Sequence, residues 1–101
     1  MPAHLTLRTG DFNERAVLDA FARERLAPHS WSNGPGDVYA SHSHTYHKVL
    51  YCLRGSITFH LTGTAEDIEL RPGDRLDIEP GTPHAATVGA GGVECIEAAK
   101  A

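Results

Sequence analysis

The pattern of apolar and polar residues changes character at Pro28. Before this proline, apolar residues recur at the spacing of one face of a helix, and charged residues fill the opposite face. Asp11 and Glu14 have the spacing of a capping box, and Pro28 is a natural terminator. We therefore predict a helix over about residues 12–26. Its apolar face consists of Ala16, Val17, Leu18, Ala20, Phe21 and Leu26.

After Pro28 the pattern becomes one of short segments rich in β-branched and aromatic residues, separated by turns rich in Gly and Pro. With one segment before the helix, about eight strands are predicted, and the first two after residue 47 are expected to form a hairpin at Gly55. No helical pattern interrupts them, which excludes a parallel α/β sheet and indicates an all-β antiparallel sandwich or barrel. The segments are 5–8, 38–42, 47–54, 56–62, 65–71, 75–79, 84–88 and 93–99.

Length and charge narrow the class of protein. A chain of 101 residues is expected to form one domain, residues 1–101. A net charge of −4 argues against nucleic acid as a partner, since phosphate binding needs a basic surface. No apolar run reaches the ~20 residues of a membrane span, and the N-terminus lacks the pattern of a signal peptide. We expect a cytoplasmic protein in which Cys52 and Cys95 are reduced thiols.

The histidines carry the candidate chemistry. His42 and His44 are two residues apart on a predicted strand, so their side chains should point to the same face. Two adjacent imidazoles can occupy two neighbouring positions around a metal ion. On a helix the same two side chains would diverge by about 200°.

Two spaced motifs resemble those of the cupins, in particular the small single-domain cupin type 2 proteins. The first motif covers residues 36–55 and runs Gly36, His42-x-His44, position 48 and Gly55. The second covers about residues 73–88 and includes Gly73, Gly81 and His84. The spacing within both motifs matches the cupin pattern.

This resemblance implies a cupin jelly-roll barrel of antiparallel strands with one short N-terminal helix. It also implies that His42, His44 and His84 bind a divalent metal ion inside the barrel, with Fe, Mn, Zn or Ni as candidates. Three positions depart from the cupin pattern. Lys48 replaces the motif glutamate, Glu79 the usual proline and Val88 the usual asparagine.

Lys48 changes the expected chemistry, because an ammonium group about 5 Å from a divalent ion would be repelled by several kcal/mol. Three alternatives follow. The lysine pairs with a carboxylate and leaves a three-histidine site, or it loses its proton on burial. In the third, metal binding is weak or absent and Lys48 binds an anionic ligand.

Three neighbouring positions complete the candidate site. His47 is an alternative metal ligand, although strand periodicity places it with Val49 and Tyr51 on the face opposite Lys48. Lys48 and Tyr46 are candidate substrate-binding residues. No catalytic residue is identified.

The sequence supports two functional hypotheses. The first is a small metal-binding cupin that acts as a metal-dependent oxygenase or isomerase on a small molecule. The alternative is a non-catalytic cupin module that binds a small anionic or sugar-like ligand. A homodimer is expected because a barrel of this size gains by packing sheet residues such as Val49, Tyr51 and Leu53 against a copy.

Overall fold

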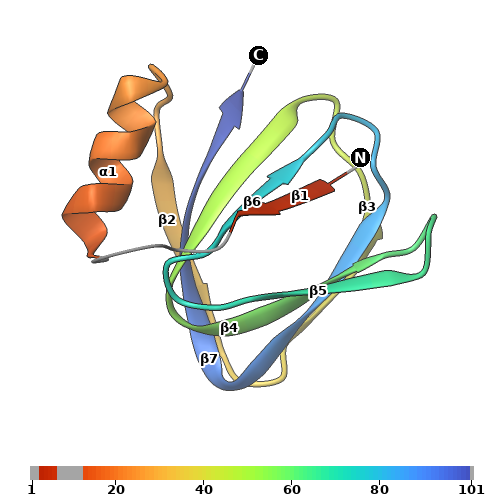
Figure 1. Cartoon of the computed structure of the whole chain (residues 1–101). Coiled ribbons are helices and arrows are strands. Elements are labelled where there is room, and N and C mark those ends of the chain that lie inside the picture. The colour runs from red at the N-terminus through yellow and green to blue at the C-terminus, as the bar shows by residue number, and fades with distance from the viewer. Residues whose placement is uncertain (1–2, 7–12, 101) are drawn as a thin grey trace.

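The computed structural model describes residues 3–6 and 13–100. These residues form one helix and seven strands, and the path of the chain through them is shown in Figure 1. In chain order they are β1 (Ala3–Thr6), α1 (Glu14–Arg23), β2 (His29–Asn33), β3 (Val38–His42), β4 (His47–Leu61), β5 (Glu66–Leu70), β6 (Arg75–Ile78) and β7 (His84–Lys100).

All strand pairs are antiparallel, as the turn spacing predicts. Along the main path the order is β1-β6-β4-β7-β2, while β3 pairs with β7 and β5 pairs with β4. The two long strands β4 and β7 pair with each other along most of their length and take part in both halves of the sheet. The first half of β4 also pairs with β6 and its second half with β5, so the sheet folds over itself into a jelly-roll barrel (Figure 1).

The predicted hairpin at Gly55 is wrong. Residues 47–61 form the single bent strand β4, and Gly55 marks the bend, with a register shift against β7 on either side. Gly55 has a φ of +76°, and Gly92 on β7 has a φ of +77°. Likewise the predicted strands 84–88 and 93–99 are the two ends of the continuous strand β7. A left-handed glycine permits a bend as readily as a turn, and the pairing of β4 with β7 decides between them.

One strand has no counterpart in the sequence prediction. Residues 29–33 form β2, which pairs with the C-terminal half of β7 and places Trp31 opposite Cys95. Its pattern of small polar residues around one tryptophan lacks the β-branched side chains that indicate a strand. The remaining strand bounds agree with the prediction to within about two residues, apart from β1, whose last predicted positions lie outside the described residues.

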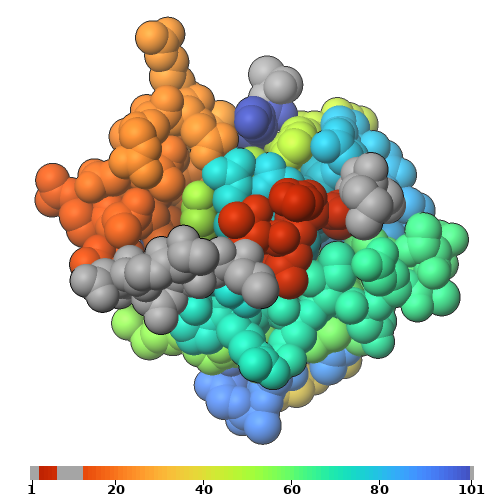
Figure 2. Space-filling model, viewed as in Figure 1, coloured from red at the N-terminus to blue at the C-terminus, as the bar shows by residue number. Residues whose placement is uncertain are grey.

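The helix is shorter than predicted, spanning Glu14–Arg23. Its N-cap is Asn13, whose side-chain oxygen accepts a hydrogen bond from the Ala16 amide at 2.8 Å. The predicted capping residue Asp11 lies outside the described residues. Figure 2 shows α1 in orange as a mass at one side of the barrel.

Two apolar clusters stabilise the fold. The larger one fills the barrel interior and includes Leu50, Cys52, Ile57, Phe59, Leu61, Leu70, Leu76 and Ile78. The smaller one lies between α1 and the outer face of the sheet, where Val17 and Phe21 contact Val49, Leu53 and Ile96. Burying side chains of this size stabilises the docked helix by about 1.5–3 kcal/mol each.

This second cluster removes one reason for expecting a homodimer. Val49 and Leu53 are buried by the chain's own helix, so this part of the sheet face is not free to pack on a copy. The homodimer stays a prediction. None of the helices among the described residues is long and apolar enough to cross a membrane.

Candidate metal centre

The fold brings together the three histidines that the motifs single out. His42 is the last residue of β3, His44 lies in the loop before β4, and His84 begins β7 directly opposite His42. Their possible ligand atoms all lie within 4.8 Å of one another. The ring centroids are 4.8 Å apart for His42 and His44, 4.5 Å for His42 and His84, and 5.2 Å for His44 and His84.

Backbone contacts orient these rings. Nδ1 of His42 lies 2.9 Å from the Ala40 carbonyl oxygen, and Nδ1 of His84 lies 3.0 Å from that of Thr82. An imidazole that donates its Nδ1–H to a carbonyl keeps an unprotonated Nε2 with a free lone pair. The Gly81 amide donates to the His44 carbonyl at 2.8 Å, which ties the loop carrying His44 to the turn before β7.

Two ring nitrogens have no partner within the described part of the chain. Nε2 of His44 and Nε2 of His84 are both buried and form no hydrogen bond. A buried polar atom without a partner destabilises a fold by about 1–3 kcal/mol. A metal ion bound between these two atoms and the third imidazole would supply the missing partner, because histidine binds Zn, Fe or Ni through a neutral ring nitrogen. The residues present therefore fit a divalent metal ion.

Burial favours the neutral form of two of the three rings, those of His44 and His84. Burial lowers the pKa of His44, and the nearby Lys48 charge lowers it further. Burial also lowers the pKa of His84, against a smaller opposing effect of its hydrogen bond to Thr82. Neutral imidazole is the form that binds metal, so the lowered pKa values favour binding at neutral pH.

Lys48 lies in the same interior and is paired with a carboxylate. Its Nζ is 3.2 Å from Oε1 of Glu97, and both side chains are 12% exposed. This arrangement corresponds to the first of the three alternatives for Lys48. Lys48 and Glu97 line a cavity of about 230 Å³, and the residues lining it are His29, Trp31, Tyr39, His42, Lys48, Ile57, Phe59, His84, Ala86 and Glu97.

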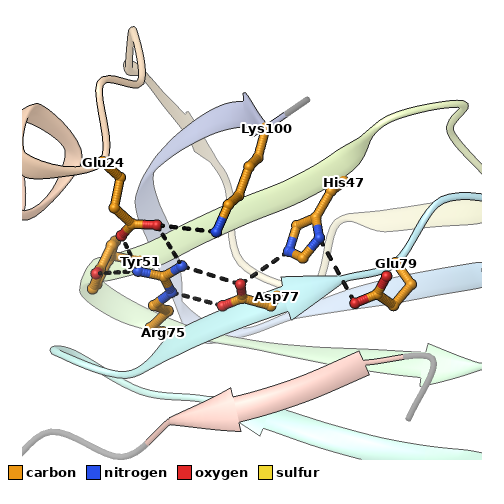
Figure 3. Close-up of polar contacts among 7 residues, drawn as sticks. All are labelled: Glu24, His47, Tyr51, Arg75, Asp77, Glu79 and Lys100. Atoms are coloured by element: carbon orange, nitrogen blue, oxygen red, sulfur yellow. Dashed lines mark hydrogen bonds and ion pairs between the residues drawn. The ribbon is translucent and has the colours of Figure 1, made fainter.

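His47 lies outside the barrel, as strand periodicity predicts. Its Nε2 donates to Asp77 at 2.9 Å, and its Nδ1 is 3.7 Å from Glu79 (Figure 3). His47 is not among the clustered histidines and does not line the cavity.

His47 belongs to an outer network centred on Arg75. The Arg75 guanidinium bonds Asp77, Glu24 and the Tyr51 hydroxyl, and Lys100 also reaches Glu24 (Figure 3). Because Glu24 directly follows α1, this network ties the end of the helix to β6 and to the end of β7.

Tyr46 contacts the centre without lining the cavity. Its ring stacks on His44 with centroids 4.9 Å apart and an interplanar angle of 28°. The side chain is half-buried and covers one face of His44. Direct contact of Tyr46 with a substrate stays a prediction.

Sequence reasoning missed four polar residues of the cavity, His29, Trp31, Tyr39 and Glu97. Trp31 donates its indole N–H to Glu97 at 2.6 Å, and His29 is 3.8 Å from the same carboxylate. Glu97 lies on β7 opposite His29 of β2. The alternation along 93–99 places Glu97 on the face of Val93 and Cys95, which is the one signal that would have found it.

Comparison with known proteins agrees with the motifs. A family model described as Cupin domain matches residues 23–96, which is most of the chain. Comparison with curated proteins finds no match.

Several solved structures share the fold. The polyketide cyclase RemF from Streptomyces resistomycificus superimposes with a TM-score of 0.67 and 24% identity, over 73% of this chain and 53% of that one. The DMSP lyase DddQ from Ruegeria pomeroyi has a TM-score of 0.67 and 24% identity, over 75% and 38%. A cupin-2 domain protein from Shewanella frigidimarina has a TM-score of 0.62 and 14% identity, over 72% and 68%. The chain thus spans about half the length of the cyclase.

Proposed function

Because the chain belongs to the cupin domain family, we propose that it is a small metal-binding cupin whose histidines hold a divalent ion inside the barrel. The observation that carries this proposal is the pair of buried, unpartnered Nε2 atoms of His44 and His84. His42 completes the ligand set from the opposite strand. The candidate ions are Fe, Mn, Zn and Ni, all of which accept imidazole ligands.

We propose further that the centre acts on a small molecule, as a metal-dependent oxygenase or isomerase. A bound ion would supply Lewis-acid chemistry, or oxygen chemistry if it is iron. Ile57, Phe59 and Ala86 give the cavity one apolar wall against which the carbon skeleton of a substrate could pack. At about 230 Å³ the cavity is smaller than the roughly 300–1,000 Å³ of common ligand pockets, which limits the substrate to a small compound.

Lys48 is the residue that would position an anionic substrate. One of its three N–H donors faces Glu97 at 3.2 Å, and the others are available to a carboxylate or enolate oxygen. A divalent ion beside Lys48 and Glu97, whose opposite charges offset each other, would give the cavity a net positive charge. Such a charge would attract an anionic group of a substrate.

The polyketide cyclase and the DMSP lyase illustrate that barrels of this fold can belong to enzymes. Each is 24% identical to this chain, a level of similarity that supports a shared fold but not a shared reaction. The reaction type therefore follows from the ion and from the residues around it, not from these neighbours.

The test is elemental analysis of tag-free protein beside His44→Ala and His60→Ala variants purified in the same way. His60 is the matched control, because it lies outside the metal cluster and bonds Asp67 and Thr87. The proposal expects near-stoichiometric metal in wild type and in His60→Ala, and little in His44→Ala. Equal metal in both variants, or none in wild type after incubation with excess divalent ions, would contradict it.

A second candidate function is a non-catalytic module that binds a small anionic or sugar-like ligand. The observation that favours it is Lys48 in the cavity wall beside His42 and His84. Ligand binding that a chelator leaves unchanged would support the module. Turnover that a chelator abolishes and one metal restores would support the enzyme.

Two further proposals concern the location of the protein in the cell and its oligomeric state and partners. We expect a cytoplasmic protein and a two-fold homodimer, and no nucleic-acid or membrane partner. Light scattering of purified protein tests the dimer, and a monomeric mass would refute it.

A further inference from the structure

The cavity has a single acidic side chain among the described residues that line it, and that residue is Glu97. Glu97 is largely buried, with 12% of its side chain exposed. A carboxylate at this depth requires partners, because burying an unpaired charge is costly. Its two carboxylate oxygens, however, differ in the polar contacts that they make.

One oxygen is fully engaged. Oε1 accepts the indole N–H of Trp31 at 2.6 Å and lies 3.2 Å from the ammonium group of Lys48. Among the described residues, no hydrogen bond reaches the other oxygen, Oε2, and the ring of His29 lies 3.8 Å from it, which is beyond hydrogen-bond distance. The His29 side chain is 67% exposed. Two donors thus hold the carboxylate in place and leave Oε2 with acceptor capacity to spare.

The rest of the wall indicates the shape of a ligand. Three aromatic rings, those of Trp31, Tyr39 and Phe59, line the cavity together with Ile57. Trp31 and Tyr39 pack edge to face, with centroids 6.2 Å apart. Flat aromatic surfaces in a small cavity favour a planar ligand.

We propose that Glu97 selects the ligand of this cavity by accepting a hydrogen bond through Oε2. The ligand would be a small planar molecule carrying an O–H or N–H group, such as an enol, a phenol or a hydroxy-carbonyl compound. Its donor group would face Glu97 while its body packs against the aromatic wall. The inference rests on the proposed function, because it takes the cavity beside His42 and His84 as the ligand site.

Trp31 provides a direct reporter for the test. It is the chain's single tryptophan, so a ¹H–¹⁵N correlation spectrum contains one indole signal, from the N–H that bonds Glu97. The probes are phenol and anisole, which differ in that a methyl group replaces the hydroxyl hydrogen. Titrations use metal-free protein, so that metal binding by the probe contributes nothing. We expect phenol to bind about tenfold more tightly than anisole, from one hydrogen bond to a charged acceptor.

Two variants distinguish the effect of the Glu97 carboxylate on probe binding from the effect of its ion pair with Lys48. Lys48→Met removes the pair and keeps the carboxylate, so the preference for phenol should remain. In Lys48→Met with Glu97→Gln, the amide oxygen can still accept from Trp31, while an NH₂ donor replaces Oε2. The preference for phenol should then be lost or reversed. Glu94→Gln is the matched control, since Glu94 bonds Arg54 and does not line the cavity.

Three outcomes would overturn the inference. They are equal affinities of phenol and anisole for wild type, no movement of the indole signal with either probe, or the same preference in Lys48→Met and in the double variant. Metal analysis is independent of this titration. A protein that binds metal in that analysis but lacks the preference would refute only the role of Glu97. One that shows the preference but takes up no divalent metal in that analysis would refute only the proposed metal function.

Discussion

Gly55 lies against the carbonyl group of Gly92 where the two longest strands bend. A Cβ atom added at Gly55 would lie 1.9 Å from the carbonyl oxygen of Gly92, far inside any allowed contact. Both glycines have left-handed φ values, of +76° and +77°. Their contact lets β4 and β7 bend together, so that each strand serves both halves of the barrel.

A series of glycine-to-alanine variants should separate backbone strain from collision. Gly63→Ala, with open space around it, should change stability by about 0.5 kcal/mol or less. Gly81→Ala has open space but a φ of +76°, and should lose about 1 kcal/mol. Gly55→Ala combines the same φ with the collision and should lose more than about 3 kcal/mol. Urea unfolding measures all three, and equal losses at Gly55 and Gly81 would show that the contact with Gly92 relaxes freely.

His47→Ala should leave metal content unchanged while lowering stability. The ring lies outside the barrel, where it donates to Asp77, so its removal costs about 1 kcal/mol from a lost hydrogen bond. Elemental analysis and urea unfolding of the same preparation check both parts. Loss of metal in this variant would indicate that His47 is a metal ligand after all.

Lys48 and Glu97 should show strong coupling in a double-mutant cycle. Lys48→Met leaves the Glu97 charge largely buried without its ion partner, and Glu97→Met does the same to Lys48. Each single change should lose about 3 kcal/mol, whereas the double variant should lose less than either. Chemical unfolding of the four proteins gives the coupling energy. Additive losses would show that the two charges do not stabilise each other.

Acid should weaken the attachment of α1. The hydrogen bond from Arg75 lowers the pKa of Glu24 from its ordinary value of 4.5, and Lys100 adds to this effect. The unfolded chain therefore binds more protons than the folded one as pH falls below about 4.5, so stability is lost in that range. Asp77 acts in the same direction: burial alone would raise its pKa, but hydrogen bonds from Arg75 and His47 outweigh burial and lower it.

Arg75→Met should flatten this acid dependence and cost about 2 kcal/mol near neutral pH. Unfolding free energies measured from pH 7 to pH 3 check both effects. Arg71→Met is the control, because Arg71 pairs with Glu69 on an exposed part of β5 and should leave the pH profile unchanged. A profile for Arg75→Met parallel to that of wild type would contradict the assigned role of Arg75.

Much of the fold was already determined by local patterns in the sequence. Alternation along 47–54 separates Lys48, Leu50 and Cys52 from His47, Val49 and Tyr51, and the structure places these two sets on opposite faces. The helix was predictable from the spacing of its apolar face, and its observed ends lie within about three residues of those predicted. The motif spacing likewise identified His42, His44 and His84, which the barrel gathers, although β3 ends at His42 and His44 lies in the following loop and not on a strand as predicted.

The tertiary structure decided what depends on contacts between distant segments. Whether Gly55 is a turn or a bend depends on its contact with Gly92, since the glycine permits both. Strand β2 forms because β7 offers it an edge, not because its own residues favour a strand. The partner of Lys48 is Glu97, which β7 supplies from the other end of the chain. Local sequence carries no information on such pairing, because register and proximity arise only when β4 and β7 align across the barrel.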